Sequence, residues 1–238
     1  MCAAGARPAR RRWTCAELEA CLRRAPDVLP GGDAHRLLAP RPRRGWQPGR
    51  RPEDSRTAAA LVLFYPRDGR PYLVLTVRSG ILSRHGGQVS FPGGAIEPGE
   101  ALIAAALREA AEEIGIDPAS VRIVGALTPL HIPVSDFTVH PIVAVADEAP
   151  AFRLATGEVE RVLEVPFEDL TDPARLRLTT RMREDFLVEV PYFDVEGEKV
   201  WGATAMMLAE LLCVVDARPD IDQAIHDEDP SGPGGPRP

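Results

Sequence analysis

The sequence predicts one compact domain that mixes α-helices and β-strands. Strand-like segments at 58–65 and 72–78 flank a turn signal at 66–69, and an alanine-rich segment at 101–114 lacks internal Gly and Pro and is followed by Gly115 as a helix cap. Hydrophobic residues make up 45% and charged residues 26% of the 238 positions, which argues against disorder or a disulfide scaffold. At about 150 residues per domain, this length allows one large domain with extensions, or two small ones.

The N-terminal segment, residues 1–54, is expected to be a basic arm with a short helix and a linker. Residues 1–52 hold 12 arginines against four acidic residues, a net charge of +8, so the rest of the chain carries −15 and the whole chain −7. A capping box at 14–17 predicts a helix over 15–24, and Pro, Arg and Gly at 39–54 predict a linker. The arm could contact nucleic acid, but it lacks a series of aromatic residues for base stacking. A solvated arm is therefore favoured, and we expect no nucleic-acid partner.

The body of the domain is expected at 55–216, followed by a tail at 217–238. Further strand candidates and a closing helix are expected at 122–127, 139–146, 159–165, 186–192 and 201–215. Seven of the last nine residues are Pro or Gly, so the tail is predicted to be disordered. No apolar run reaches the roughly 18 residues of a membrane span, and the four cysteines form no C-x-x-C pair. We therefore expect a cytoplasmic protein with reduced thiols and no membrane partner.

The most informative stretch is FPGGAIEPGEALIAAALREAAEEIGI at 91–116. At about 100° per residue, Glu109, Glu112 and Glu113 lie on one helix face, and apolar side chains lie opposite. Like charges at this spacing repel unless a cation lies among them, and oxygen-preferring Mg²⁺ or Mn²⁺ is the natural one. A solvated acidic helix face would give the same charge pattern. The Pro-Gly-Gly turn before the helix favours a platform for metal and phosphate.

Within this stretch, Gly94, Glu100 and the segment REAAEEIGI at 108–116 match G-x5-E-x7-R-E-U-x-E-E-x-G-U, so the chain resembles the Nudix hydrolases. The resemblance implies an α/β/α sandwich with a mixed β-sheet, and hydrolysis of a nucleoside diphosphate linked to another moiety with Mg²⁺ or Mn²⁺. It implies that Glu109, Glu112 and Glu113 bind the metal and supply the base. Arg108 would orient Glu109, and Glu100 would support the site. The pattern usually has a bulkier aliphatic residue where this chain has Ala110, which weakens packing under the helix.

A second resemblance lies directly upstream. The segment LTVRSGILSRHGGQVSFPGG at 75–94 is similar to the L-T-x-R-S-x-x-L-R-x-H-x-G-Q-V-x-F-P-G-G element of the coenzyme A pyrophosphatase branch of that superfamily. Carried over, this element implies four substrate-binding residues: Arg78, Arg84, His85 and Gln88. Ser83 stands where the branch usually has Arg, and Arg84 follows one position later. Fragments at Glu158 and at 201–205 also resemble this branch, so the similarity covers about 56–215, and Glu158 becomes a second candidate base or an extra metal ligand.

These observations lead to one expected reaction and two alternatives. We expect a divalent-metal-dependent pyrophosphohydrolase that cleaves coenzyme A or a derivative into 4′-phosphopantetheine and adenosine 3′,5′-bisphosphate, with Glu109 as the first candidate base. Arg78 or Arg84 would contact phosphate oxygens. The alternatives are hydrolysis of another nucleoside diphosphate derivative, such as ADP-ribose or NADH, and a catalytically silent nucleotide sensor. His131 and His140 lie in apolar strand contexts and are expected to be structural.

Overall fold

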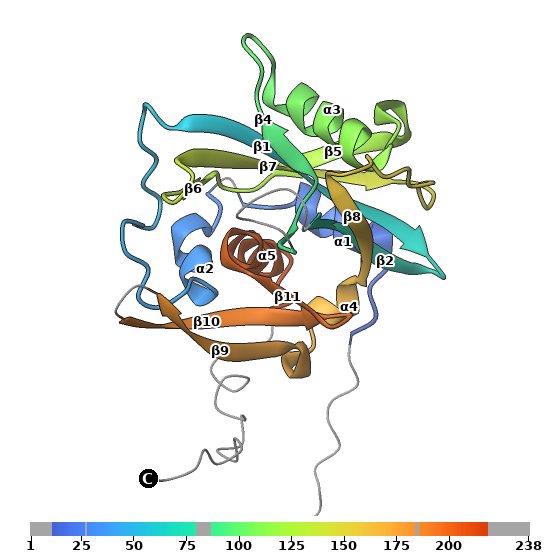
Figure 1. Cartoon of the computed structure of the whole chain (residues 1–238). Coiled ribbons are helices and arrows are strands. Elements are labelled where there is room, and N and C mark those ends of the chain that lie inside the picture. Colours follow the sequence, from blue (N-terminus) through green and yellow to red (C-terminus); the bar gives the residue numbers. More distant parts are fainter. Residues whose placement is uncertain (1–10, 27, 80–86, 184–185, 219–238) are drawn as a thin grey trace, which may run out of the picture.

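The computed structural model describes residues 11–26, 28–79, 87–183 and 186–218 (Figure 1). The helices are α1 (Cys15–Arg23), α2 (Gly31–Leu37), α3 (Leu102–Ile114), α4 (Phe167–Leu170) and α5 (Gly202–Val214), with short 3₁₀ helices η2 (Pro118–Ser120) and η3 (Pro173–Arg175). The strands are β1 (Arg56–Arg67), β2 (Arg70–Arg78), β3 (Val89–Ser90), β4 (Gly93–Ala95), β5 (Val121–Ala126), β6 (Leu130–Ile132), β7 (Phe137–Ala146), β8 (Val159–Pro166), β9 (Leu176–Arg183), β10 (Phe186–Val195) and β11 (Glu198–Trp201).

Eight strands form one mixed sheet, and three form a second, smaller sheet. The main sheet runs in the order β3-β2-β1-β7-β5, with β4 paired to β1, β6 to β7 and β8 to β2. Its central strands β1 and β7 are parallel, and the other pairs are antiparallel. Helix α3 covers one face of this sheet, and α5 lies between the other face and the β9-β10-β11 sheet (Figure 1). The predicted α/β/α architecture with a mixed sheet is confirmed.

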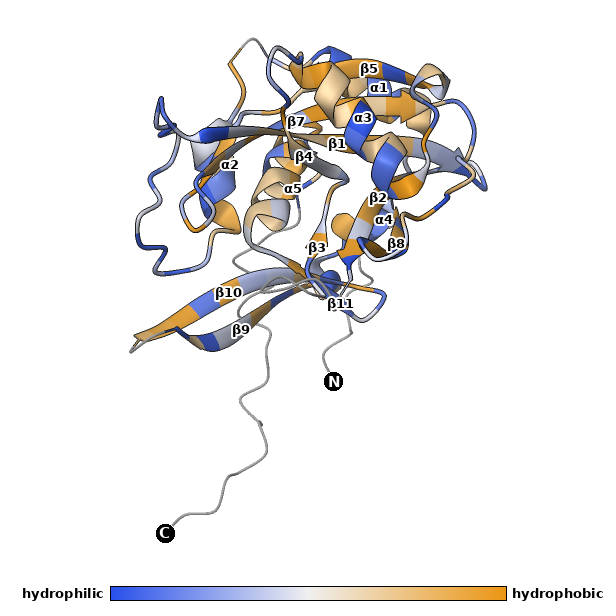
Figure 2. Ribbon diagram, turned by 45° about the horizontal axis from the view of Figure 1, so that its top comes forward, coloured by the Kyte–Doolittle hydropathy of each residue, from blue (hydrophilic) through white to orange (hydrophobic). Residues whose placement is uncertain are grey.

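Strand β1 divides the core into two halves because its side chains alternate between the faces of the sheet. Leu61 and Leu63 pack into the cluster under α3, whereas Val62 and Phe64 pack into the larger cluster on the α5 side. Helix α5 is buried on nearly all sides, and Figure 2 shows it with little hydrophilic colour, whereas α3 carries a hydrophilic outer face. This one-sided burial leaves Glu112 of α3 exposed, whereas Glu109 and Glu113 are half-buried.

The strongest local signals predict their elements correctly. The hairpin forms between β1 and β2, and its turn is at Asp68 and Gly69, which both have positive φ angles of 52° and 72°. Helix α3 ends at Gly115, which adopts the left-handed conformation with φ of 72°. Helix α1 begins at the predicted capping box, in which Thr14 and Glu17 each bond the other's backbone N–H.

Part of the expected N-terminal arm contributes to the core. Trp13, Leu18 and Leu38 are each 2% exposed or less and pack in the α5-side cluster. Helix α2, which the sequence did not predict, packs against α5. Strands β9 and β11 of the small sheet were also not predicted. The tail predicted to be disordered lies, from residue 219 on, outside the described residues, and no helix in the described part of the chain combines the length and apolarity needed to cross a bilayer.

Candidate active site

The double-glycine strand β4 brings the sheet close to the acidic face of α3. A Cβ atom at Gly93 would overlap the backbone of Ala59 and Ala60, and one at Gly94 would overlap the carboxylate of Glu109. Gly93 therefore needs glycine for space, whereas a side chain at Gly94 would require the Glu109 carboxylate to move; no positive φ is involved at either position. The consequence is that the carboxylate of Glu109 rests directly on the backbone of Gly94.

Arg108, in the middle of α3, bonds the carboxylates of three glutamates. Its Nε and Nη2 donate to the two oxygens of Glu100 at 2.8 and 3.0 Å, a bidentate pair. Its Nη1 donates to Glu109 Oε1 at 2.9 Å and to Glu112 Oε2 at 3.3 Å, and Nη2 also reaches the carbonyl of Ala95 at 3.1 Å. The bonds from Arg108, followed by the backbone N–H of Glu97, lower the pKa of Glu100 to about 2, so Glu100 stays ionised as an anchor for the guanidinium.

Glu113 occupies the most enclosed position of the three glutamates. The backbone N–H of Gly93 donates to its Oε2 at 3.1 Å. Burial raises the pKa of Glu113 to about 7, the Gly93 bond and Arg78 act to lower it, and the charges of Glu109 and Glu158 raise it further. Three carboxylates and one guanidinium are therefore within electrostatic reach of one another at this point.

Glu158 and Arg78 reach this point from neighbouring strand ends. Arg78 ends β2 opposite Val159 of β8, and the backbone N–H of Ser79 donates to the carbonyl of Glu158 at 2.9 Å. The side chains of Arg78 and Glu158 are both exposed. A cation and a carboxylate thus flank the enclosed Glu113 from the same sheet edge.

The remaining residues singled out from the sequence differ in how exposed they are and in what they bond. Glu112 is more exposed than Glu109, with 59% of its side chain accessible against 17%. Gln88 is half-buried, and its carbonyl accepts a bond from the backbone N–H of Arg78 at 2.9 Å. Arg84 and His85 lie outside the described residues. His131 is buried and bonds Asp136 at 3.2 Å, as expected of a structural residue.

The donor chemistry of this cluster fits a hard divalent cation. All candidate ligands are carboxylate oxygens, the type that Mg²⁺ and Mn²⁺ prefer. The raised pKa of Glu113, to which the charges of Glu109 and Glu158 contribute, shows repulsion that a cation would relieve. Among the described residues, however, no three His, Cys, Asp or Glu side chains converge closely enough to form a ready metal cage. Arg108 pairs with both Glu109 and Glu112 in this arrangement.

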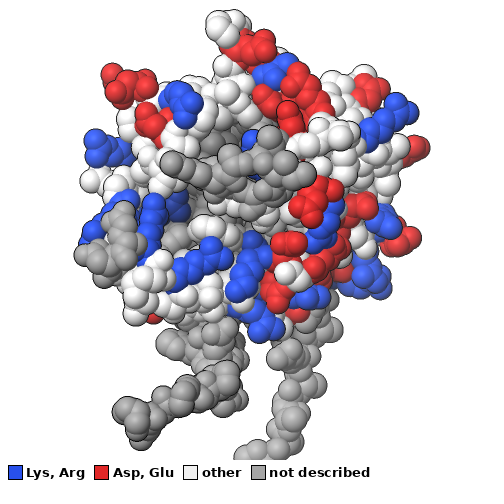
Figure 3. Space-filling view, in the orientation of Figure 1, with Lys and Arg blue, Asp and Glu red and all other residues white. Residues whose placement is uncertain are grey.

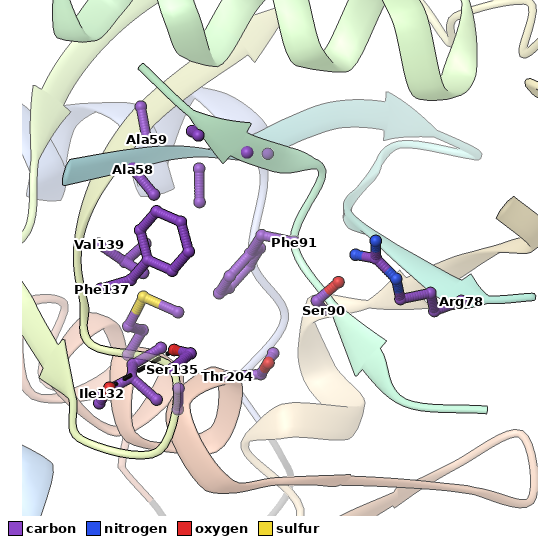
Figure 4. Close-up of a pocket in the computed structure, with 16 residues that line it drawn as sticks. Ala58, Ala59, Arg78, Ser90, Phe91, Ile132, Ser135, Phe137, Val139 and Thr204 are labelled. Carbon is purple, nitrogen blue, oxygen red and sulfur yellow. Dashed lines mark hydrogen bonds between the residues drawn. The ribbon is translucent and has the colours of Figure 1, made fainter. Parts of the chain in front are cut away.

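A cavity of about 220 Å³ lies beside the carboxylate cluster, and we call it the Phe91–Phe137 cavity (Figure 4). Gly93 and Gly94 line it, and Arg78 stands at its edge (Figure 4). The sequence analysis did not identify Phe137 or Met207 as lining residues. Phe91 belongs to the element at 75–94, and the resembling fragment at 201–205 contains two lining residues of α5, so a weak signal for part of the cavity was available.

Acidic side chains gather over α3 on the face shown in Figure 3, and basic side chains gather over the lower part that holds the small sheet. Two arginines of β9 lie on aromatic or acidic partners: Arg181 over the ring of Trp201, and Arg177 3.5 Å from Asp194. Acidic side chains are thus present where a cation-dependent site would need them, and other acidic side chains lie elsewhere on the same face (Figure 3).

Comparison with known proteins is consistent with this geometry. The family model of the NUDIX domain matches residues 55–184. A protein described as Uncharacterized Nudix hydrolase NudL, from Citrobacter koseri, is 38% identical over 166 residues, which is 69% of this chain and 86% of the relative. A protein of the same description from Klebsiella pneumoniae is 38% identical over 176 residues, 73% of this chain and 90% of the relative.

Solved structures also match parts of the chain, at low identity and low TM-score. The Nudix hydrolase RenU from M. smegmatis superposes with a TM-score of 0.43 and 24% identity, over 50% of this chain and 74% of its own. A MutT/nudix family protein from Enterococcus faecalis superposes with a TM-score of 0.45 and 17% identity, over 74% of this chain and 69% of its own. From the family match over more than half of its length and the curated relatives, the chain belongs to the Nudix hydrolase family.

Proposed function

We propose that this chain hydrolyses the diphosphate of coenzyme A or of a coenzyme A derivative, with Mg²⁺ or Mn²⁺, to 4′-phosphopantetheine (or its derivative) and adenosine 3′,5′-bisphosphate. The observation that supports this most is the placement of Glu113, which is held by the N–H of Gly93 between other carboxylates and the Arg78 guanidinium. In such a site, a bound divalent cation and the arginine would both contact the same phosphoanhydride.

In this proposal Glu109, Glu112 and Glu113 hold the divalent ion, which when bound would neutralise the diphosphate and make a water molecule more acidic. Glu109 is the first candidate to accept the proton from the attacking water, and Glu158 is the second candidate base or an extra ligand. Arg108 positions Glu109 through its 2.9 Å bond, and Glu100 fixes Arg108 in turn.

The coenzyme A assignment rests on the sequence element at 75–94. Arg78 is the charged residue in the described part of this element that lies at the cavity and within electrostatic reach of Glu113. A guanidinium there would make charge-assisted bonds to the oxygens of the diphosphate. We propose Arg84, His85 and Gln88 as further substrate-binding residues.

The test is hydrolysis of coenzyme A with Mg²⁺ or Mn²⁺ by wild type, by Glu112→Gln and by a matched control, Glu148→Gln. Glu148 is exposed in the loop after β7 and is none of the proposed site residues, so Glu148→Gln removes the same charge outside the site. We expect wild type and Glu148→Gln to release both products, and Glu112→Gln to be strongly impaired. Equal rates in all three would remove the assigned site. A panel with ADP-ribose and NADH separates the alternatives, and inactivity on every substrate would favour the silent sensor.

A further inference from the structure

Most of the side chains that line the Phe91–Phe137 cavity are apolar. The rings of Phe91 and Phe137 point into it (Figure 4), and Met207 adds a thioether from α5. The other apolar lining residues include small alanines of β1 and glycines of β4. Among the described residues that line it, Arg78 is the only one with a charged side chain.

The polar side chains that line this cavity are already engaged within the protein. Thr204 donates its hydroxyl to the carbonyl of Val89 at 2.9 Å, and Ser135 donates to the carbonyl of Ile132 at 3.4 Å. The hydroxyl of Ser90 shares a bond of 3.4 Å with Thr76. Each of these hydroxyls therefore already has a partner within the protein, and among the described lining residues only Arg78 has a charge that would neutralise a second phosphate, whereas an aliphatic group needs no such partner.

The two halves of coenzyme A differ in what they would require of this cavity. On one side of the diphosphate, the pantetheine arm begins with a methylene group followed by a carbon that carries two methyl groups, and this segment has no charge. On the other side lies a ribose with its 3′-phosphate and adenine. Burying that phosphate would need a cation, and the single guanidinium at the cavity edge is within electrostatic reach of Glu113 and is the one proposed to bind the diphosphate.

Building on the proposed function, we propose that the pantetheine arm enters the Phe91–Phe137 cavity, and that the adenosine 3′,5′-bisphosphate half stays outside it. The dimethyl segment then packs against the rings of Phe91 and Phe137, directly inward from the diphosphate. Arg78 holds the diphosphate at the cavity edge. Only the pantetheine side of the diphosphate buries apolar groups, and this burial sets the orientation of the substrate relative to the carboxylates.

Ala203→Leu tests this orientation. Ala203 lies in the first turn of α5, is half-buried and lines the cavity, so a leucine there fills space without breaking the helix. The ligands are the two products, 4′-phosphopantetheine and adenosine 3′,5′-bisphosphate, measured separately by calorimetry with Mg²⁺, which excludes turnover. We expect Ala203→Leu to weaken the binding of 4′-phosphopantetheine by about 10-fold or more, because overpacking displaces the arm. The binding of adenosine 3′,5′-bisphosphate should be unchanged. Ala119→Leu, on the exposed helix η2, should change neither.

A second measurement needs no variant of the cavity. In wild type with bound 4′-phosphopantetheine, magnetisation transfer between the two ligand methyl groups and phenylalanine ring protons is expected. Two results would overturn the orientation while the proposed reaction stands. One is that Ala203→Leu weakens only the binding of adenosine 3′,5′-bisphosphate, and the other is magnetisation transfer from adenine protons, instead of the methyl groups, to the phenylalanine rings. Absence of coenzyme A hydrolysis in wild type, together with binding of neither product, would overturn the proposed function and the orientation with it.

Discussion

Arg108 and Glu100 form a two-pronged ion pair across the turn that precedes α3, with Nε–Oε1 at 2.8 Å and Nη2–Oε2 at 3.0 Å. The same guanidinium contacts Glu109 through its remaining nitrogen. Only a planar guanidinium can donate hydrogen bonds to both carboxylates at once, and a lysine ammonium cannot reproduce this geometry. Glu109 is therefore oriented by a residue that need not touch the substrate.

This geometry predicts that Arg108→Lys lowers kcat on coenzyme A by about 10- to 100-fold, with little change in KM, because the positioning of the base is lost while substrate contacts remain. Steady-state kinetics with Mg²⁺ will measure both constants, and circular dichroism will verify the fold. Arg122→Lys is the matched control, since Arg122 pairs with Asp147 and Glu19 at the surface. A kcat for Arg108→Lys equal to that of this control would mean that Arg108 does not position the base.

Gly94→Ala is expected to reduce kcat about 100-fold, because the new methyl group would occupy the space of the Glu109 carboxylate and displace it. Gly125→Ala provides a control for adding a methyl group to a strand glycine, since a Cβ there meets no atom within 4 Å. Both variants should melt cooperatively in thermal scans. Full activity in a folded Gly94→Ala protein would show that Glu109 can move without consequence and is not the base.

Glu113 gives the metal-free protein a specific pH dependence. Its pKa rises from the ordinary 4.5 to about 7 on folding, so the folded state holds more protons between these values, and this contribution to stability is lost as pH rises through about 7. Because glutamine does not ionise, Glu113→Gln removes this pH-dependent loss of stability. In urea unfolding with a chelator, we expect the variant to match wild type near about pH 4.5 and to exceed it above about pH 7 by on the order of 2 kcal/mol. Parallel stability curves for the two proteins at all pH values would contradict this.

The elements that could be predicted from sequence are those with a local cause. The capping box of Thr14 and the left-handed Gly115 mark helix ends within a few residues of themselves, and both predictions are confirmed. Helix α2 has no such signal. It begins with Gly31 and Gly32, which are poor helix formers, and it is held by a contact to Glu210, 179 residues from Gly31. Tertiary contacts decide this segment, so local propensity could not reveal it.

The candidate site shows the same division. Glu109, Glu112 and Glu113 can be placed together from helical spacing alone, because one helix carries them all. The Phe91–Phe137 cavity draws on β1, β4, β7 and α5, whose mutual placement depends on the whole sheet. Periodicity identifies Phe137 and Met207 as apolar, but it cannot distinguish a side chain that fills the core from one that borders a hole in it.

The buried carboxylate of Glu210 connects three distant parts of the chain, and its removal should be costly. It is fully buried and accepts bonds from the backbone N–H groups of Gly31 and Thr128 and from the hydroxyl of Thr128, with His35 at 3.0 Å. Glu210→Ala would leave these donors unpaired in the core, and we expect a loss of about 3–5 kcal/mol in the free energy of unfolding measured in urea. Exposed Glu148→Ala should change it by less than about 0.5 kcal/mol. Because Glu210 lies on α5, which also carries Ala203 and Met207, a loss no larger than that of the control would mean that the N-terminal segment does not brace the cavity wall.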